Sequence, residues 1–175
     1  MEKVTQIASY LLDRYKMQYG EIMDEIKLQK LLYFIQREAI IRTGELMFDA
    51  EFRAWKYGPV ILVIHDRYKA NELKETLPQE SQVHWKECFD YIFTEFAPKK
   101  TMNLVSLAHG EKSWIRDREG YGKYESSDVP MKVSDIFEDA EYRRHRRCTL
   151  PVRRAINSLY QKHPQIQRIP IIHAL

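Results

Sequence analysis

The chain has 175 residues, of which 44% are hydrophobic and 12% aromatic, and its formal net charge is +3, a composition that excludes an intrinsically disordered protein. No apolar run approaches the ~18 residues that a membrane-spanning helix needs, and the first residues lack the basic start and apolar stretch of a secretory signal. Two cysteines, Cys88 and Cys148, are too few for a disulfide framework, so we expect a cytoplasmic protein with no membrane partner.

Two amphipathic helices are predicted at the start of the chain. From Val4 to Tyr15 the apolar residues recur every three or four positions, and Gly20 occupies a typical C-terminal capping position. The second helix is expected to begin near Asp24 and to end at Gly44. Its apolar residues cover more than one face, which predicts a central, buried helix.

Residues 46–57 alternate weakly between apolar and polar positions, which indicates a short strand or extended ribbon. We expect Gly58 and Pro59 to end this ribbon, because proline supplies no backbone donor to a strand ladder. Proline fits the first turn of a helix, so the sequence predicts a helix from there to about Lys69.

The rest of the chain is predicted as amphipathic helices joined by polar loops. Helices are expected at 83–96, 102–108, 113–115, 135–142 and from 151 onward. Ser113 would cap the third of these helices, and Val152, Ala155, Ile156, Leu159 and Tyr160 would face inward in the last. Loops are expected at 70–81 and 120–133, and an extended end at 166–175. The elements together define a mainly α fold, a compact multi-helix domain with a short β element and a C-terminal extension.

Charge is distributed unevenly along the chain. Residues 143–175 contain eight basic and no acidic residues, whereas residues 1–142 contain 20 basic and 25 acidic ones. This contrast predicts a domain over 1–142 and a basic C-terminal extension over 143–175. The densest run of the extension is either a solvated surface or a site for an acidic protein surface or nucleic acid. It consists of Arg143, Arg144, Arg146 and Arg147.

Enzymatic chemistry is not indicated by the sequence, and we expect no enzyme, no cofactor and no metal site. His109 and Glu111 lack the spacing of zinc ligands, and we interpret His109 as a buried hydrogen-bonding residue that fixes a turn. His84 and Cys88 are four residues apart, which would bring them together on one helix. We interpret Cys88 as a small core residue instead.

Residues 101–119 have the length of a helix-turn-helix. Their second half mixes Arg116 and Arg118 with Asp117 and Glu119. A DNA-reading helix normally presents a more uniformly basic face to the phosphates, so direct DNA binding by this segment is not favoured.

Three motifs distinguish this chain from a generic helical protein. They are Lys27-Leu-Gln-Lys-Leu-Leu-Tyr33, Ala54-Trp-Lys-Tyr-Gly-Pro-Val60, and the stretch from Leu104 to Trp114 that contains His109 and Glu111. In sequence and spacing they resemble the Panacea domain, the SocA-like antitoxin family that is also described as GepA phage-associated. The resemblance covers roughly residues 4–142. The chain departs from the pattern at Ala108, where the family often has threonine or serine.

The resemblance implies an antitoxin of a bacterial toxin–antitoxin system, which neutralises a cognate toxin protein by direct binding. In one branch of the family the antitoxin hands its toxin to a cytosolic protease. The motif residues are then either structural or toxin-binding, and they are Lys27, Gln29, Lys30, Tyr33, Trp55, Lys56, Tyr57, Gly58, Pro59, His109, Glu111 and Trp114. The alternative function is a nucleic-acid-binding regulator that uses the arginine run.

Trp55 has two interpretations. It is either an aromatic anchor on a recognition surface that also contains Lys56 and Tyr57, or a core residue that holds the ribbon against the central helix. We favour the core position, because burying so large an aromatic side chain contributes strongly to folding. Gly58 and Pro59 are interpreted as structural residues that shape the turn.

Overall fold

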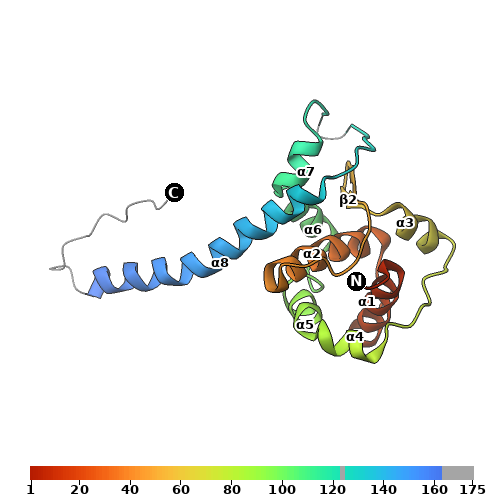
Figure 1. Cartoon of the computed structure of the whole chain (residues 1–175), viewed down its shortest axis with the longest axis horizontal. Helices are drawn as coiled ribbons and strands as arrows, with labels where there is room; N and C mark the ends of the chain where they lie inside the picture. The colour runs from red at the N-terminus through yellow and green to blue at the C-terminus, as the bar shows by residue number, and fades with distance from the viewer. Residues whose placement is uncertain (123–124, 163–175) are drawn as a thin grey trace. The chain divides into compact units, whose positions relative to one another are not determined.

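The computed structural model describes residues 1–122 and 125–162, with side chains described through Arg147. This part of the chain contains eight α-helices and one two-stranded sheet (Figure 1), so the predicted mainly α fold with a short β element is confirmed. The chain divides into two compact units, Met1–Ala140 and a second unit that begins at Glu141. Whether the functional domain ends at residue 142 stays a prediction.

The first two helices form as predicted. Helix α1 spans Val4–Tyr19 and helix α2 spans Glu25–Thr43; both end at a glycine with left-handed backbone, which only glycine adopts without strain. Asp24 caps α2, since its side chain accepts a hydrogen bond from the Lys27 amide at 2.8 Å. Every residue of α2 from Lys27 to Ile41 is buried, so α2 is the central helix of the unit.

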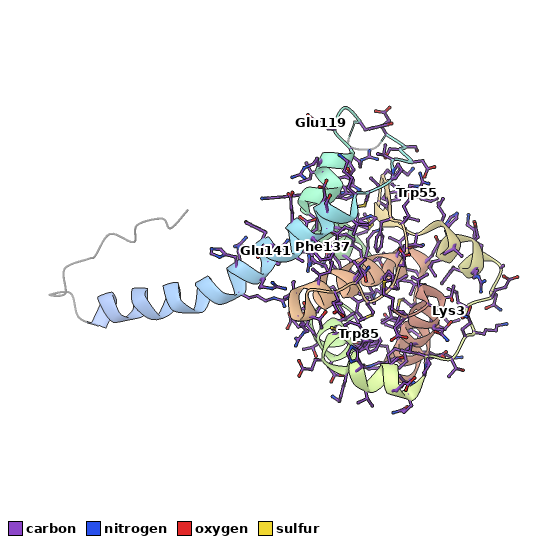
Figure 2. The ribbon with its side chains drawn as sticks, viewed as in Figure 1. Lys3, Trp55, Trp85, Glu119, Phe137 and Glu141 are labelled. Carbon is purple, nitrogen blue, oxygen red and sulfur yellow. The ribbon has the colours of Figure 1, made fainter. Side chains whose placement is uncertain are left out.

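The other helices of the first unit surround α2. Helices α1, α3, α5 and α6 and strand β2 all contact it (Figure 1), which explains why its apolar surface exceeds one face. The first residues of α8 pack against the same core through Ile136, Phe137 and Ala140, of which Phe137 is labelled in Figure 2. The remaining bounds are α3 Leu62–Lys69, α4 Gln79–His84, α5 Lys86–Glu95, α6 Thr101–Ala108, α7 Lys112–Asp117 and α8 Val133–Lys162.

Gly58 and Pro59 lie in a strand, so the prediction that they end the ribbon and start a helix is wrong. Strand β1, Arg53–Trp55, pairs antiparallel with strand β2, Gly58–Val60, and Pro59 lies opposite Ala54. The amide of Ala54 donates to the Val129 carbonyl at 2.8 Å, on the edge of β1 that faces away from β2. The Ala54 carbonyl accepts from the Arg118 guanidinium at 3.2 Å and from the Ser127 hydroxyl, so it requires no N–H from Pro59.

Three further helix boundaries differ from the predictions. Residues 79–82 are helical because Pro78 begins a turn instead of lying inside a loop, and the predicted helix over 83–96 is divided into α4 and α5. Helix α7 begins at Lys112, so Ser113 lies inside it and not at its cap. Helix α8 is continuous through residues 143–150, which contain no glycine or proline and are rich in arginine, a good helix former. The inward-facing residues predicted after 151 and the extended end at 166–175 lie outside the described side chains and residues.

Candidate functional site

Two buried polar side chains of α2 hold the β-hairpin in place. The ammonium of Lys30 donates to the Pro59 carbonyl at 2.7 Å. The amide of Gln29 donates to the Ile61 carbonyl at 3.1 Å and accepts from the Ile61 N–H at 2.9 Å. These bonds satisfy buried backbone groups next to the hairpin, and the Ile61 carbonyl also accepts from the α3 amides of Ile64 and His65 at 3.1 Å. The Leu-Gln-Lys motif therefore fixes β2 and the start of α3.

Gly58 allows the hairpin to approach α2 and α6 closely. Its φ is +99°, in the region that favours glycine, and a Cβ at this position would lie 2.7 Å from Lys30 Cε and 3.2 Å from Ala108 Cβ. Ala108 is thus the small residue against which the hairpin turn packs. The two motifs meet here, because Lys30 of the α2 motif fills the space that Gly58 of the hairpin motif leaves open.

Arg118 attaches the hairpin to the loop before α8. Its guanidinium, 5% exposed, donates to the Ala54 carbonyl at 3.2 Å and to the Gly122 and Glu125 carbonyls at 2.9 and 2.7 Å. The Ser127 hydroxyl also donates to the Ala54 carbonyl. The sequence indicated Arg118 only as part of an unfavoured DNA-binding segment, and no local pattern pointed to this structural role.

Trp55 lies on the hairpin at the edge of the unit (Figure 2), and the expectation that it is a core residue is wrong. It is half-buried; its indole N–H donates to the Asp128 carboxylate at 2.9 Å, and its ring lies edge-on to His65 at 5.0 Å. Trp114 is the buried tryptophan instead, 7% exposed, and it donates to the Trp55 carbonyl at 2.9 Å. Backbone and side chain of Trp55 are therefore held by different partners.

The turn of the hairpin presents the other two residues of the aromatic motif. Tyr57 is 42% exposed, and the Lys56 ammonium lies over its ring, 5.0 Å from the centroid. Trp55, Lys56 and Tyr57 thus remain accessible on a hairpin whose backbone is fixed by buried groups. The structure places these predicted site residues together on one surface.

A pocket of about 600 Å³ lies beside this hairpin. Its walls come from the start of α2, the hairpin, α3 and residues 126–128, and they include Ile26, Trp55, Tyr57 and Val60. At its edge the Glu25 carboxylate pairs with His65 Nδ1 at 2.5 Å. The pocket also includes Gln29 and Lys30, so both major motifs contribute to it.

Lys30 is the most strongly perturbed titratable group of this pocket. The side chain is 1% exposed, and burial lowers the pKa of its ammonium to about 7, although the nearby Glu25 carboxylate acts in the opposite direction. Near neutral pH the group is therefore present in both the charged and the neutral form.

Lys27 and Tyr33, the remaining α2 motif residues, serve packing and do not line the pocket. The Lys27 ammonium donates to the Tyr15 hydroxyl at 3.0 Å and the Ala97 carbonyl at 3.2 Å. The Tyr33 hydroxyl donates to the Asp139 carboxylate at 2.9 Å, and burial raises the pKa of Tyr33 well above its ordinary value. Asp139 also accepts from the first amides of α7, at 2.8 and 3.1 Å, so it replaces the cap that the sequence assigned to Ser113.

His109, Glu111 and Trp114 lie together near the start of α7 but hold no catalytic arrangement. The His109 ring stacks on Trp114 with centroids 4.0 Å apart, and Glu111 forms a buried ion pair with Arg37 at 2.5 Å. His109 is half-buried, in place of the fully buried position that was expected. These contacts support a structural role for the third motif.

The described residues give little indication of a cysteine nucleophile or a metal site. Cys88 is buried in α5, as expected, and burial raises the pKa of its thiol to about 12, so the thiolate form is suppressed. His84 belongs to α4, a different helix. Across residues 1–122 and 125–147, no group of three or more potential ligands could hold a metal ion.

The basic residues of the suspected helix-turn-helix are engaged within the first unit. Arg116 pairs with Asp135 at 2.7 Å and with Glu138 at 2.9 Å, while Arg118 is buried in the loop contacts described above. Helix α7 has six residues. The segment therefore offers little free positive charge to a phosphate backbone.

The arginine run lies in the second unit, on α8. Arg146 is exposed, and its guanidinium donates to the Tyr142 hydroxyl at 3.3 Å. Arg143, Arg144 and Arg147 are half-buried. A partner for this run stays a prediction. Among the described helices, none combines the length and apolar character needed to cross a membrane.

Comparison with known proteins agrees with the motifs. Residues 28–115, half of the chain, match the family described as antitoxin SocA-like, Panacea domain, and the chain belongs to this family. Antitoxin SocA of Caulobacter vibrioides (strain NA1000 / CB15N) is 37% identical over 49 residues, which is 28% of this chain and 26% of that protein. The matched stretch thus spans about a quarter of that relative's length. No solved structure matches this chain.

Proposed function

We propose that this protein is a cytoplasmic antitoxin that neutralises a cognate toxin protein by direct binding, without catalytic turnover. Membership of the antitoxin SocA-like family supports this function. The high pKa of the Cys88 thiol and the structural contacts of His109 and Glu111 favour a binding protein over an enzyme.

The toxin-binding surface in this proposal is the hairpin with Trp55, Lys56 and Tyr57. The observation that supports it is that the residues of the Ala54–Val60 motif have two different roles. Gly58 and Pro59 are buried and fix the backbone, whereas the three preceding side chains are left accessible. Accessible aromatic residues on a rigid support are typical binding hot spots, because little conformational entropy is lost when they bind.

Co-expression tests this function. The adjacent gene is expressed alone and together with this protein, and growth is followed. We expect the neighbour to inhibit growth alone and growth to recover on co-expression. A harmless neighbour, or toxicity that this protein leaves unchanged, would contradict the antitoxin function.

The Tyr57→Ala variant tests the proposed surface, with Tyr121→Ala as a matched control. The two tyrosines are 42% and 41% exposed, so their substitutions change similar surface areas. We expect Tyr57→Ala to weaken toxin binding by about 1–2 kcal/mol, as truncation of an interface aromatic residue does, while Tyr121→Ala retains the affinity. Equal affinities of both variants in calorimetry would place the toxin elsewhere.

Handing the toxin to a cytosolic protease is the alternative route of neutralisation. Direct binding predicts that the amount of toxin stays constant while growth recovers. A fall in toxin level that depends on this protein would instead indicate the protease route.

A further inference from the structure

The pocket beside the hairpin contains two ammonium groups with few acceptors. Lys30 has three N–H donors, but the described residues supply one acceptor, the Pro59 carbonyl at 2.7 Å. Lys56 contacts the ring of Tyr57 and makes no ion pair with a described residue. A buried lysine with so few acceptors leaves donors available to a ligand that enters the pocket.

The carboxylates of the pocket are already engaged. Glu25 pairs with His65 at 2.5 Å, and Asp128 accepts the Trp55 indole N–H at 2.9 Å. At Lys30 and Lys56, hydrogen-bond donors therefore outnumber the acceptors that the described residues supply. This arrangement is complementary to an anion and not to a cation.

The rest of the pocket is apolar. Ile26, Trp55, Tyr57 and Val60 line it, and its volume of about 600 Å³ is in the range that holds a small organic molecule. An ion such as phosphate would leave these walls without a contact. A ligand that fits both parts has an apolar body and one anionic end.

We propose that this pocket binds an apolar carboxylate, whose aryl or alkyl body packs against Trp55 and Val60 and whose carboxylate bonds to Lys30 and Lys56. The pocket shares Trp55, Lys56 and Tyr57 with the proposed toxin-binding surface, but carboxylate binding is testable without a toxin. Two kinds of molecule can supply such a carboxylate: a free organic acid, or a partner protein with an acidic residue next to an apolar side chain.

Ligand binding at this site is linked to protonation of Lys30. A bound carboxylate stabilises the ammonium form, so binding takes up a proton where Lys30 is neutral in the free protein. The charged or titratable groups around Lys30 are Glu25 on α2, His65 on α3, Lys56 on the hairpin and Asp128 in the loop, while α6 contributes no charged residue.

Calorimetric titration with phenylacetate, phenylpropionate and phenylbutyrate tests the proposal, with the corresponding amides as neutral controls. We expect one or more acids to bind at least about tenfold more tightly than the matched amide, as a charge-assisted hydrogen bond requires. Because the pKa of Lys30 is about 7, that acid should bind about tenfold more weakly at about pH 8 than at about pH 6. Amides that bind as well as the acids, or no binding at all, would overturn the proposal.

Three variants test which lysine is responsible for the preference for acid over amide and for the pH dependence. Lys30→Met keeps the length of the side chain and should abolish both the preference for acid over amide and the pH dependence; its melting curve shows whether it folds. Lys56→Met, on an accessible side chain, should weaken acid binding alone, and Lys74→Met, an exposed lysine outside the pocket, should change nothing. A pH dependence that persists in a folded Lys30→Met protein would belong to another group and would overturn the role of Lys30.

Competition with purified toxin distinguishes the two sources. If the acid displaces the toxin, the natural carboxylate belongs to a toxin segment that enters the pocket. If acid and toxin bind together, the natural ligand is a free organic acid. Either result is compatible with a pocket that binds a carboxylate. Whether the pocket requires a carboxylate is tested by the amide controls.

Discussion

Lys30 is the residue on which the hairpin, the pocket and the central helix converge. Its stem packs against Gly58, and its ammonium bonds to the Pro59 carbonyl at 2.7 Å. A buried lysine destabilises the folded state because its charged form loses hydration. The same loss of hydration lowers the pKa of Lys30 to about 7. A methionine could fill the same space, so the presence of lysine here is consistent with a role in binding.

Gly58→Ala should destabilise the protein more than Gly20→Ala. Both glycines have positive φ, but a Cβ at Gly58 would meet Lys30 Cε at 2.7 Å, whereas a Cβ at Gly20 meets nothing within 4 Å. We expect losses of about 2 and about 1 kcal/mol, since backbone strain is common to both and steric overlap is not. Urea unfolding measures both values, and equal losses would show that the hairpin adjusts without cost.

Lys30 should also make stability depend on pH. The pKa is about 7 in the folded state and 10.5 ordinarily, so the unfolded chain binds more protons between these values and stability rises with pH across this window. Wild-type protein and Lys30→Met are compared by urea unfolding at several pH values in this range. We expect the stability of the wild type, relative to the variant, to increase from neutral to alkaline pH. A difference that is constant with pH would mean that Lys30 stays charged when folded.

At the scale of elements, some motif residues hold the backbone of the hairpin and others are accessible to a partner. Gln29 and Lys30 hold the backbone of β2 and the start of α3, while Trp114 and Arg118 hold the backbone of β1. Four side chains, from α2 and from α7 with its C-cap, thus fix a turn of two residues. Such support keeps the accessible side chains in one orientation before a partner binds.

Trp55→Ala and Trp114→Ala should separate binding from folding. Trp114 is buried, so its truncation should cost about 3–5 kcal/mol. Trp55 is half-buried, and we expect a loss of about 1–2 kcal/mol together with a marked loss of toxin binding. Thermal unfolding and calorimetry with the toxin measure the two effects. Retained toxin affinity in Trp55→Ala would remove this residue from the proposed surface.

At the scale of the whole molecule, the acidic part and the basic extension differ in the partners that they favour. Residues 143–175 contain eight basic and no acidic residues. Of the acids that precede the run, Glu138 and Asp139 are engaged with Arg116 and with Tyr33 in the first unit. A positive run of this density can raise the rate at which an acidic partner associates.

Changing Arg143, Arg144, Arg146 and Arg147 to serine distinguishes an antitoxin from a nucleic-acid-binding regulator. We expect toxin association to slow, with a modest dependence on salt, and each substitution to alter stability by no more than about 0.5 kcal/mol. Nucleic-acid binding predicts instead an affinity that falls by ~0.9 log units per log of salt for each neutralised phosphate, with a shallower slope in the variant. Tight duplex or RNA binding that the substitutions abolish, with neutralisation intact, would favour the regulator.

The sequence alone determined the features that depend on neighbours along the chain. Helices α1 and α2 and their ends followed from apolar periodicity, Asp24, Gly20 and Gly44, because capping and amphipathicity act over a few residues. The resemblance of the motifs also identified the family, since those residue combinations are specific even without a structure.

Only the tertiary structure decided what those motifs do, because the deciding contacts join distant residues. Pro59 is tolerated in a strand because the Ala54 carbonyl opposite it accepts from Arg118 and Ser127, and Asp139 supplies the capping that was assigned to Ser113. Trp55 is half-buried, whereas Trp114 is buried and donates to the Trp55 carbonyl. The pocket exists because α2, the hairpin, α3 and the loop before α8 meet there, and desolvation at such a meeting point depends on all of them together.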